Sequence, residues 1–359
     1  MAIDLLCENA DAIQTFLREK GWIAPLATIE RLTPAGEGNM NRTLRATLAN
    51  NYSDVASSSS ASSTSRGKLI LKQSLPYVAK YPQIAAPQTR LSVEAAFYKA
   101  TAHSHSVQLY MPKMLQYNAE ERIMCLEDLG SGADMTTAYQ SGNGERPFNA
   151  EHRISLMKWL ASLHSIQVTD VDRDCSFINM DMRVLNHQHI FDLPLTPDNG
   201  IELDGFTSGL QKVADEYVGD TALREKAKNL GDIYLGKKVN KESNNVLLHG
   251  DFYPGSFLSN DETGVKVIDP EFAFYGPAEF DLGVFIAHCQ FCGVDTDEVE
   301  DALNAYTRPF DYKLSFAFAG IELIRRILGV AQLPLPADTT LDIKEEWLKQ
   351  GRIWIKDWD

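Results

Sequence analysis

Apolar and polar residues alternate in short runs through the first third of the chain, a pattern that predicts β-strands. A few longer segments carry apolar residues at the three- and four-residue spacing of a helix. The strands are expected at residues 29–48, where a glycine turn separates two of them, and at 68–75, 111–117 and 122–130, and the helices at 4–20 and 90–102. This part of the chain therefore predicts a small, antiparallel sheet with a helix beside it.

Residues 51–67 interrupt the strand pattern. The segment is rich in serine and holds almost no apolar side chains, so it cannot contribute to a packed core. We expect a long, flexible hairpin loop between two strands.

Helical spacing dominates from residue 150 onward. The helices are expected at 152–166, 207–235, 279–332 and 341–350, with short strand pieces at 246–252, 257–261 and 264–272, while the segment up to about residue 205 has no clear pattern and contains Pro194 and Pro197. The prediction is an α+β fold with two lobes. Residues 1–130 form a small lobe built on an antiparallel sheet, and residues 131–359 form a large, mainly helical lobe.

Composition and charge narrow the classes of partner. The chain has 359 residues, a formal net charge of -15 and a pI of about 5.0. An acidic surface repels phosphate backbones and anionic lipid, so neither nucleic acid nor membrane is expected as a partner. Five cysteines, an odd number in a chain too long to need disulfides, fit reduced thiols and a cytoplasmic location.

Two short, mainly apolar runs each lead into acidic residues. Residues 246–248 precede a His-Gly-Asp sequence that ends at Asp251, and residues 265–268 precede Asp269-Pro-Glu271. Two buried strands that end in carboxylates are expected to place those carboxylates side by side at one rim. Clustered carboxylate oxygens suit Mg²⁺ together with substrate phosphates, and an acid without metal can take a hydroxyl proton. One such aspartate alone often only caps a turn, but the pair favours a functional site.

Lys72 stands inside an apolar strand, where an ammonium ion is costly unless it is paired. Glu94, in the following helix, is the expected partner, and a strand lysine held by a helix glutamate is how kinases bind the α- and β-phosphates. The turn with Gly36, Gly38 and Asn39 can cover phosphates with its backbone amides, although the same glycines also suit a simple hairpin turn.

These features together resemble the aminoglycoside phosphotransferase and choline kinase superfamily, and within it most closely the 5-methylthioribose kinases. The resemblance extends from about residue 30 to about residue 330. The matching segments are GEGNMN (36–41), LILKQSLPYV (69–78), CLEDL (125–129), HGD with GS (249–251 and 255–256), DPEFAFYGPAEFDLG (269–283) and IRRILG (324–329). The resemblance implies a bilobal, protein-kinase-like fold that uses ATP and Mg²⁺.

On the nucleotide side, the resemblance implies that Lys72, supported by Glu94, contacts the ATP phosphates beneath the glycine turn. The backbone around Glu127 and Leu129 would hydrogen-bond the adenine. Asp269 and Glu271 would bind Mg²⁺.

On the acceptor side, the resemblance implies that Asp251 is the catalytic base or the acid that orients the hydroxyl. Arg325 and Arg326 match an arginine pair that contacts the sugar in methylthioribose kinases, although helix-surface salt bridges are the alternative for such a pair. Asp281 would brace the catalytic loop. Tyr253 and Pro254 replace the His-Thr pair of the methylthioribose kinases, next to where the acceptor sits, and this difference leaves the acceptor open.

Three functions therefore remain in view. The first is a kinase that phosphorylates a hydroxyl of a small molecule, possibly a methylthioribose-like sugar. The second is a kinase of cationic acceptors such as aminoglycosides or choline, and the third is a nucleotide-binding module without catalysis. A homodimer is possible, in which the C-terminal tryptophans are buried either between two copies or on the chain's own core.

Overall fold

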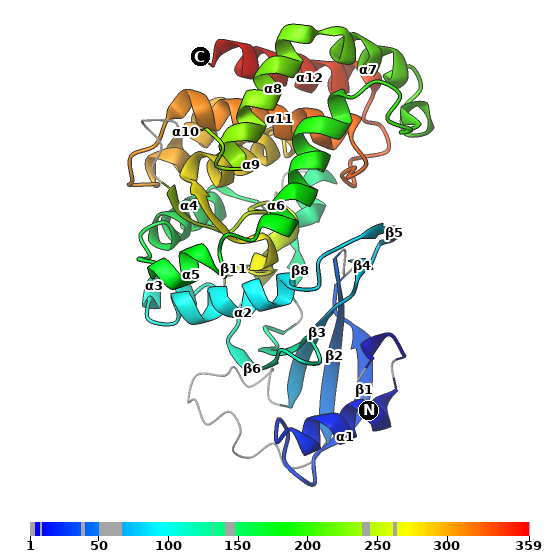
Figure 1. Cartoon of the computed structure of the whole chain (residues 1–359), viewed down its shortest axis with the longest axis vertical. Coiled ribbons are helices and arrows are strands. Elements are labelled where there is room, and N and C mark those ends of the chain that lie inside the picture. The colour runs from blue at the N-terminus through cyan, green and yellow to red at the C-terminus, as the bar shows by residue number, and fades with distance from the viewer. Residues whose placement is uncertain are drawn as a thin grey trace. The chain divides into compact units, whose positions relative to one another are not determined.

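The computed structural model describes residues 4–7, 9–36, 40–49, 67–130, 132–140, 148–238, 245–260 and 264–358. The chain divides into two compact units, which are described separately (Figure 1). The first unit comprises Met1–Ala133 and Ser259–Glu271, and the second comprises Asp134–Leu258 and Phe272–Asp359. The predicted lobe boundary at residue 130 stays a prediction, and the predicted Ser-rich loop lies almost wholly outside the described residues.

The first unit is built on a five-stranded sheet in which every neighbouring pair is antiparallel, as the alternating pattern predicted. Its strands, in spatial order, are β1 (Thr28–Pro34), β2 (Asn41–Ala49), β3 (Lys68–Ser74), β7 (Ile123–Glu127) and β6 (Met114–Asn118). A short hairpin of β4 (Tyr77–Val78) and β5 (Tyr81–Ala85) was not predicted. The helices of this unit are η1 (Leu5–Cys7), α1 (Ala10–Glu19), α2 (Arg90–Thr101) and α3 (His105–Gln108).

Along β3, alternate side chains point to the apolar core and to the polar residues around Lys72. Leu69 and Leu71 join an apolar cluster that includes the buried face of α1. Because successive side chains of a strand point to opposite faces, Lys72 points away from this cluster. Helix α2 packs against β3, β6 and β7, and it supplies Glu94 to Lys72. The sheet thus has one mainly apolar face and another that accepts a buried ion pair.

The segment 264–271 belongs to the first unit through backbone contacts. The amide of Val267, in β11 (Gly264–Val267), donates to the carbonyl of Tyr110 at 2.7 Å, and the Lys266 ammonium donates to the carbonyl of Leu109. Asp269 follows with φ of 61°, in the left-handed region that residues other than glycine rarely adopt. Such strain persists only where the surroundings hold it, and it is common at functional sites.

The second unit is mainly helical, which together with the sheet of the first unit confirms the α+β class. Its main helices are α4 (Ala150–Leu163), α7 (Leu210–Gly219), α8 (Thr221–Tyr234), α9 (Ala278–Phe291), α10 (Thr296–Asn304), α11 (Tyr312–Leu328) and α12 (Leu341–Asp357). Strands β9 (Asn245–Leu248) and β12 (Phe274–Pro277) pair antiparallel, and short 3₁₀ turns occur at η2 (Met135–Gln140) and η6 (Pro254–Ser256). The 3₁₀ turn η7 (Pro270–Phe272) crosses the sequence boundary between the units. β8 (Ala133–Asp134) and β10 (Phe257–Asn260) span sequence boundaries between the units.

The segment without a clear pattern is largely ordered into short helical pieces. These are α5 (Asp170–Asp174), α6 (Met180–His187), η3 (Gln188–Asp192), η4 (Leu193–Leu195) and η5 (Leu203–Gly205). Pro194 lies in the first turn of η4, where a missing amide donor costs nothing. Pieces this short carry too few turns for helical periodicity to be visible in the sequence.

Helix α11 lies in the core of the second unit, packed against both α9 and α12 (Figure 1). It meets α12 at a pair of glycines. A Cβ atom added to Gly320 would lie 2.4 Å from the carbonyl oxygen of Gly351, so the two backbones approach too closely for any other residue. Trp347 and Trp354 of α12, both partly buried, make ring contacts with Phe291 and Phe316 of the same chain.

Among the residues that the structure describes, no helix is both long and apolar enough to cross a membrane.

Candidate active site

Lys72 holds the centre of the polar cluster in the first unit. Its side chain is 2% exposed, and its ammonium nitrogen lies 2.6 Å from a Glu94 carboxylate oxygen and 2.8 Å from Oδ1 of Asp269. The expected pair of Lys72 and Glu94 is therefore present. Burial disfavours the ammonium ion, but the carboxylates of Asp269, Glu94 and Glu271 outweigh it and raise the pKa of Lys72 well above its usual value. Lys72 is a permanent cation beside an aspartate side chain that is 45% exposed.

The Glu271 carboxylate is enclosed by other side chains, whereas the Asp269 carboxylate is accessible. One oxygen of its carboxylate accepts a hydrogen bond from Asn41 at 2.7 Å and lies 3.2 Å from Nε of Arg90. Arg90 is completely buried and also donates to Oδ1 of Asn41 and to the carbonyls of Met40 and Leu75. Sequence reasoning missed Arg90 and Asn41, although a buried arginine at the start of the predicted helix 90–102 needed a carboxylate partner just as Lys72 did.

The predicted adenine-binding segment follows the last residue of β7. The amide of Glu127 donates to the carbonyl of Lys113 at 2.9 Å, and Leu129 is half-buried. Between them, the buried carboxylate of Asp128 forms a two-pronged ion pair with Arg45, which also donates to the carbonyl of Gly130. This clamp, unpredicted from the sequence, fixes the path of the backbone from 127 to 130.

The predicted glycine turn is only partly visible. Gly36 has φ of 73°, and a Cβ atom added there would have no atom of the described residues within 4 Å. Gly38 and Asn39 lie outside the described residues.

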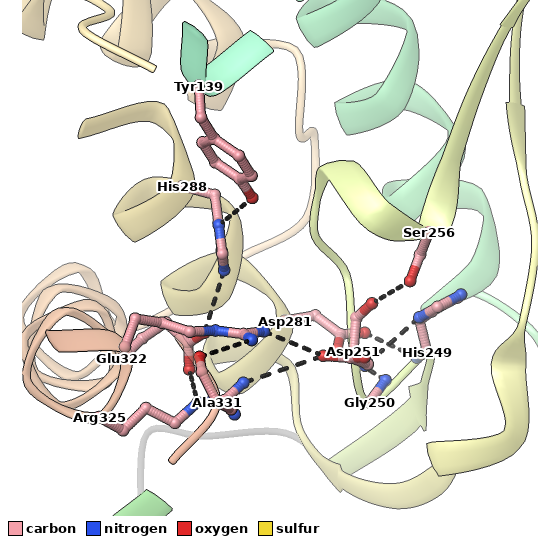
Figure 2. Close-up of polar contacts among 11 residues, drawn as sticks. Tyr139, His249, Gly250, Asp251, Ser256, Asp281, His288, Glu322, Arg325 and Ala331 are labelled. Atoms are coloured by element: carbon pink, nitrogen blue, oxygen red, sulfur yellow. Dashed lines mark hydrogen bonds and ion pairs between the residues drawn. The ribbon is translucent and has the colours of Figure 1, made fainter. Parts of the chain in front are cut away.

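In the second unit, Asp251 stands in a loop held by Asp281. The two oxygens of Asp281 accept hydrogen bonds from the amides of His249 (2.7 Å) and Gly250 (2.9 Å). Gly250 has φ of 85°, and an added Cβ would lie 2.2 Å from the carbonyl oxygen of Phe272, so only glycine fits. The hydroxyl of Ser256 donates to the carbonyl of Asp251 (Figure 2). These contacts hold the backbone of the loop and leave the Asp251 side chain 23% exposed.

The Arg325 and Arg326 guanidinium groups face Asp251. Their Nη2 atoms lie 3.9 and 3.8 Å from Oδ1 of Asp251, close enough for attraction and too far for hydrogen bonds. Their Nε atoms instead donate to the two oxygens of the buried Glu322 (Figure 2). Burial opposes ionisation of Glu322, but Arg325 and Arg326 outweigh it and hold its pKa well below the usual value. Both arginines are buried rather than on the helix surface, but they do form the helical salt bridges that the alternative expected.

Tyr253 lies against Arg326. The Arg326 guanidinium sits 4.8 Å from the centre of the tyrosine ring, and the ring also contacts that of His288 at 5.1 Å. Tyr253 thus makes a cation–π contact with one of the two arginines.

Sequence reasoning missed the other residues around Asp251. His288 joins Tyr139 to Glu322, with its ring nitrogens 2.7 and 3.0 Å from the two partners (Figure 2). The short turn η3 adds His189, whose pKa is lowered by burial and by the charge of Arg325. The charges of Arg325 and Asp251 also act on Tyr234. No sequence motif marks these residues, because the residues that they contact are distant in the sequence.

The buried His288 makes stability depend on pH. Burial, opposed by its hydrogen bond to Glu322 and reinforced by Arg326, lowers the pKa of His288 from 6.5 to about 4. The unfolded chain therefore binds this proton at a higher pH than the folded chain. The stabilisation is fully present above pH 6.5 and is lost as the pH falls toward 4.

We expect the free energy of unfolding of the wild type to fall by about 3 kcal/mol more than that of His288→Gln between pH 7 and pH 4. Urea unfolding of both proteins across this range measures the difference. His105→Gln, which changes an exposed histidine, is the control. Parallel curves for the wild type and His288→Gln would contradict the prediction.

The chain was compared with known proteins. The model of the family described as "Phosphotransferase enzyme family" matches residues 58–314, well over half of the chain. The chain belongs to this family. A methylthioribose kinase of Exiguobacterium sibiricum is 31% identical over 339 residues, which cover 80% of this chain and 82% of that protein. A methylthioribose kinase of Bacillus mycoides is 26% identical over 80% of this chain and 81% of the relative.

Solved structures show the same fold at low sequence identity. A macrolide 2′-phosphotransferase of Brachybacterium faecium has a TM-score of 0.51 at 17% identity and covers 95% of this chain and 97% of its own. Spectinomycin phosphotransferase, solved with ADP and its antibiotic, has a TM-score of 0.50 at 12% identity, with 96% of this chain and 97% of its own covered.

This phosphotransferase therefore has the fold that its motifs predicted, and it is an ATP-dependent kinase of small molecules. Family membership excludes the third alternative, a nucleotide-binding module without catalysis, because the relatives are kinases and phosphotransferases.

Proposed function

We propose that this phosphotransferase moves the γ-phosphoryl group of MgATP to a hydroxyl of a neutral, methylthioribose-like sugar. The observation that carries the proposal is the pair of guanidinium groups, Arg325 and Arg326, which stand 3.9 and 3.8 Å from Asp251. A planar fork of N–H donors suits vicinal hydroxyls and phosphate oxygens, and it repels a cationic acceptor. The similarity to methylthioribose kinases supports the same class of acceptor.

On the acceptor side, Asp251 orients the hydroxyl and takes its proton. A general base must lie within hydrogen-bond reach of that proton, and Asp251 has a partly exposed carboxylate on a braced loop. Arg325 and Arg326 bind sugar hydroxyls and the oxygens of the transferred group. Tyr253 forms an aromatic wall that keeps the Arg326 plane in place.

On the nucleotide side, Lys72, held by Glu94, contacts the α- and β-phosphates. Asp269 fits a metal-binding role, because its carboxylate is accessible and Mg²⁺ needs only one or two carboxylates besides phosphates and water. Glu271 is the second ligand that the family motif suggests, but Asn41 and Arg90 enclose it, so Asp269 is the principal one. Bound Mg²⁺ would neutralise charge on the phosphates.

For the rest of the nucleotide, Gly36, Gly38 and Asn39 cover the phosphates. The backbone of Glu127 and Leu129 receives the adenine, in a segment that the Arg45–Asp128 clamp holds in place. A homodimer remains a prediction.

A cationic acceptor, such as an aminoglycoside or choline, is the second candidate. Such acceptors need carboxylates or aromatic faces. Tyr253 is aromatic, but its ring already faces the Arg326 guanidinium. The charge around Asp251 therefore favours the neutral sugar.

We expect ADP release in a coupled assay to be stimulated by methylthioribose or a related pentose. Because like charges in one pocket cost several kcal/mol, kcat/KM for these sugars should exceed that for choline and aminoglycosides by at least about 100-fold. Homoserine completes the panel as an acyclic alcohol that carries both charges. Turnover with a cationic acceptor but with no sugar would overturn the proposed acceptor while leaving the kinase intact.

A further inference from the structure

Glu322 binds two arginines because of its place on α11. Residues three and four positions apart lie on the same side of a helix, whereas neighbours such as Arg325 and Arg326 diverge by about 100°. Glu322 precedes these arginines by three and four positions, so one carboxylate reaches the Nε atoms of both. The two guanidinium groups are thereby drawn together, with their Nη2 atoms toward Asp251.

His288 holds Glu322 from the other side. The ring is fully buried beside two arginines, and both effects favour the neutral form. A carboxylate only accepts hydrogen bonds, so the Nε2 atom of His288 must carry the proton that it shares with Glu322 at 3.0 Å. The Nδ1 atom is then an acceptor, and the Tyr139 hydroxyl donates to it at 2.7 Å. The donor and the acceptor of each hydrogen bond from Tyr139 to Glu322 are therefore determined.

We propose that Tyr139, His288 and Glu322 form a buried positioning chain that sets the orientation of the two guanidinium groups at the acceptor site. The inference rests on the proposed function of Arg325 and Arg326. Tyr139 and His288 act through Glu322 rather than on the reacting atoms, so they are positioning residues. The chain lies wholly within the second unit (Figure 2).

The physical need for such a chain follows from the arginine side chain. A guanidinium plane on a long, flexible stem loses much rotamer freedom when it must face one direction. A single carboxylate can rotate about its own χ angles, and the Nε2–H of His288 fixes that rotation. The charges also balance, because Glu322 and Asp251 together offset the two arginines while His288 stays neutral. Preorganised donors of this kind act mainly on the transition state, so their loss lowers kcat more than it raises KM.

The second unit contains another series of hydrogen bonds from a tyrosine through a histidine to a carboxylate. The Tyr306 hydroxyl lies 2.8 Å from Nδ1 of His164, and Nε2 of His164 lies 3.3 Å from Asp281, which holds the loop before Asp251. This chain ends on backbone amides and has no contact with the arginines. Tyr306→Phe is therefore a matched control for Tyr139→Phe, since each variant removes one buried hydroxyl from a histidine.

The test is a double-mutant cycle between Tyr139→Phe and Arg326→Lys. Hydrogen bonds connect Tyr139 to Arg326 through His288 and Glu322. The Tyr253 ring also contacts both His288 and Arg326, and it is the same in every variant of the cycle. In the wild type, we expect Tyr139→Phe to lower kcat about five-fold, which corresponds to the loss of one hydrogen bond. In the Arg326→Lys background, the same substitution should lower kcat less than about two-fold, which is within the error of additivity. Tyr306→Phe should have the same effect in both backgrounds. Equal effects of Tyr139→Phe in both backgrounds would overturn the proposal.

A second measurement does not depend on an acceptor. Arginine Nε–H protons bound to a buried carboxylate exchange slowly with water, so we expect protected arginine Nε–H signals in ¹⁵N-resolved NMR spectra, of which one disappears in Arg325→Lys and another in Arg326→Lys. His288→Leu should lose this protection, whereas His288→Gln, which keeps an amide donor near the Nε2 position, should retain it. Loss in both variants, or absence in the wild type, would overturn the inference. Protection that follows this pattern without turnover on any acceptor would support the positioning chain and contradict the proposed function.

Discussion

Replacement of Asp251 by asparagine is expected to lower kcat by about 10³-fold while leaving the affinity for MgATP unchanged. Asparagine keeps the size of the side chain but cannot accept the proton of the acceptor hydroxyl. The loop should keep its shape, because the contacts that hold it come from the backbone and from Asp281. Steady-state kinetics and calorimetric titration of MgATP separate the two effects.

The control for this substitution is Asp170→Asn, which removes a carboxylate of the same unit that is 86% exposed. It should retain wild-type kinetics. An Asp251→Asn enzyme that keeps a tenth of the wild-type kcat would show that another group orients the hydroxyl. A large loss of MgATP affinity would instead mean that Asp251 serves the nucleotide.

The second large effect is expected at Asp269. In Asp269→Asn, the affinity for ATP in the presence of Mg²⁺ should fall at least ten-fold, because even indirect partners of a metal ligand contribute about 10–100-fold to metal affinity. The fold should survive, since Asp269 is partly exposed and Lys72 keeps Glu94 as a buried partner. Titration calorimetry with and without Mg²⁺ measures the effect directly.

Removal of Mg²⁺ provides the sharper comparison. If Asp269 holds the metal, chelation should weaken ATP binding strongly in the wild type and hardly at all in Asp269→Asn. Glu120→Gln, an exposed carboxylate of the first unit, should behave as the wild type. Equal sensitivity of wild type and Asp269→Asn to chelation would place the metal elsewhere and contradict the role of Asp269.

The amino-acid sequence by itself determined the elements with strong periodicity and the residues with an unavoidable local cost. Alternation predicted the antiparallel sheet, because strand side chains alternate between faces. Lys72 in an apolar strand required a buried counter-ion, and the next helix offered Glu94, as the structure has it. Glu322 was also within reach of sequence reasoning, since a glutamate three and four residues before two arginines is a helical ion-pair signal.

Only the tertiary structure decided which distant residues complete each cluster. Tyr139 and His288 are 149 positions apart, and Asn41 and Glu271 are 230 apart, so no spacing rule connects them. Burial also decided the state of Arg325 and Arg326, because the same residues on a solvated helix face would be ordinary surface charges. Local preferences act over a few residues, whereas these contacts arise from the packing of α9 against α11 and from the segment 264–271, which joins the sheet unit late in the chain.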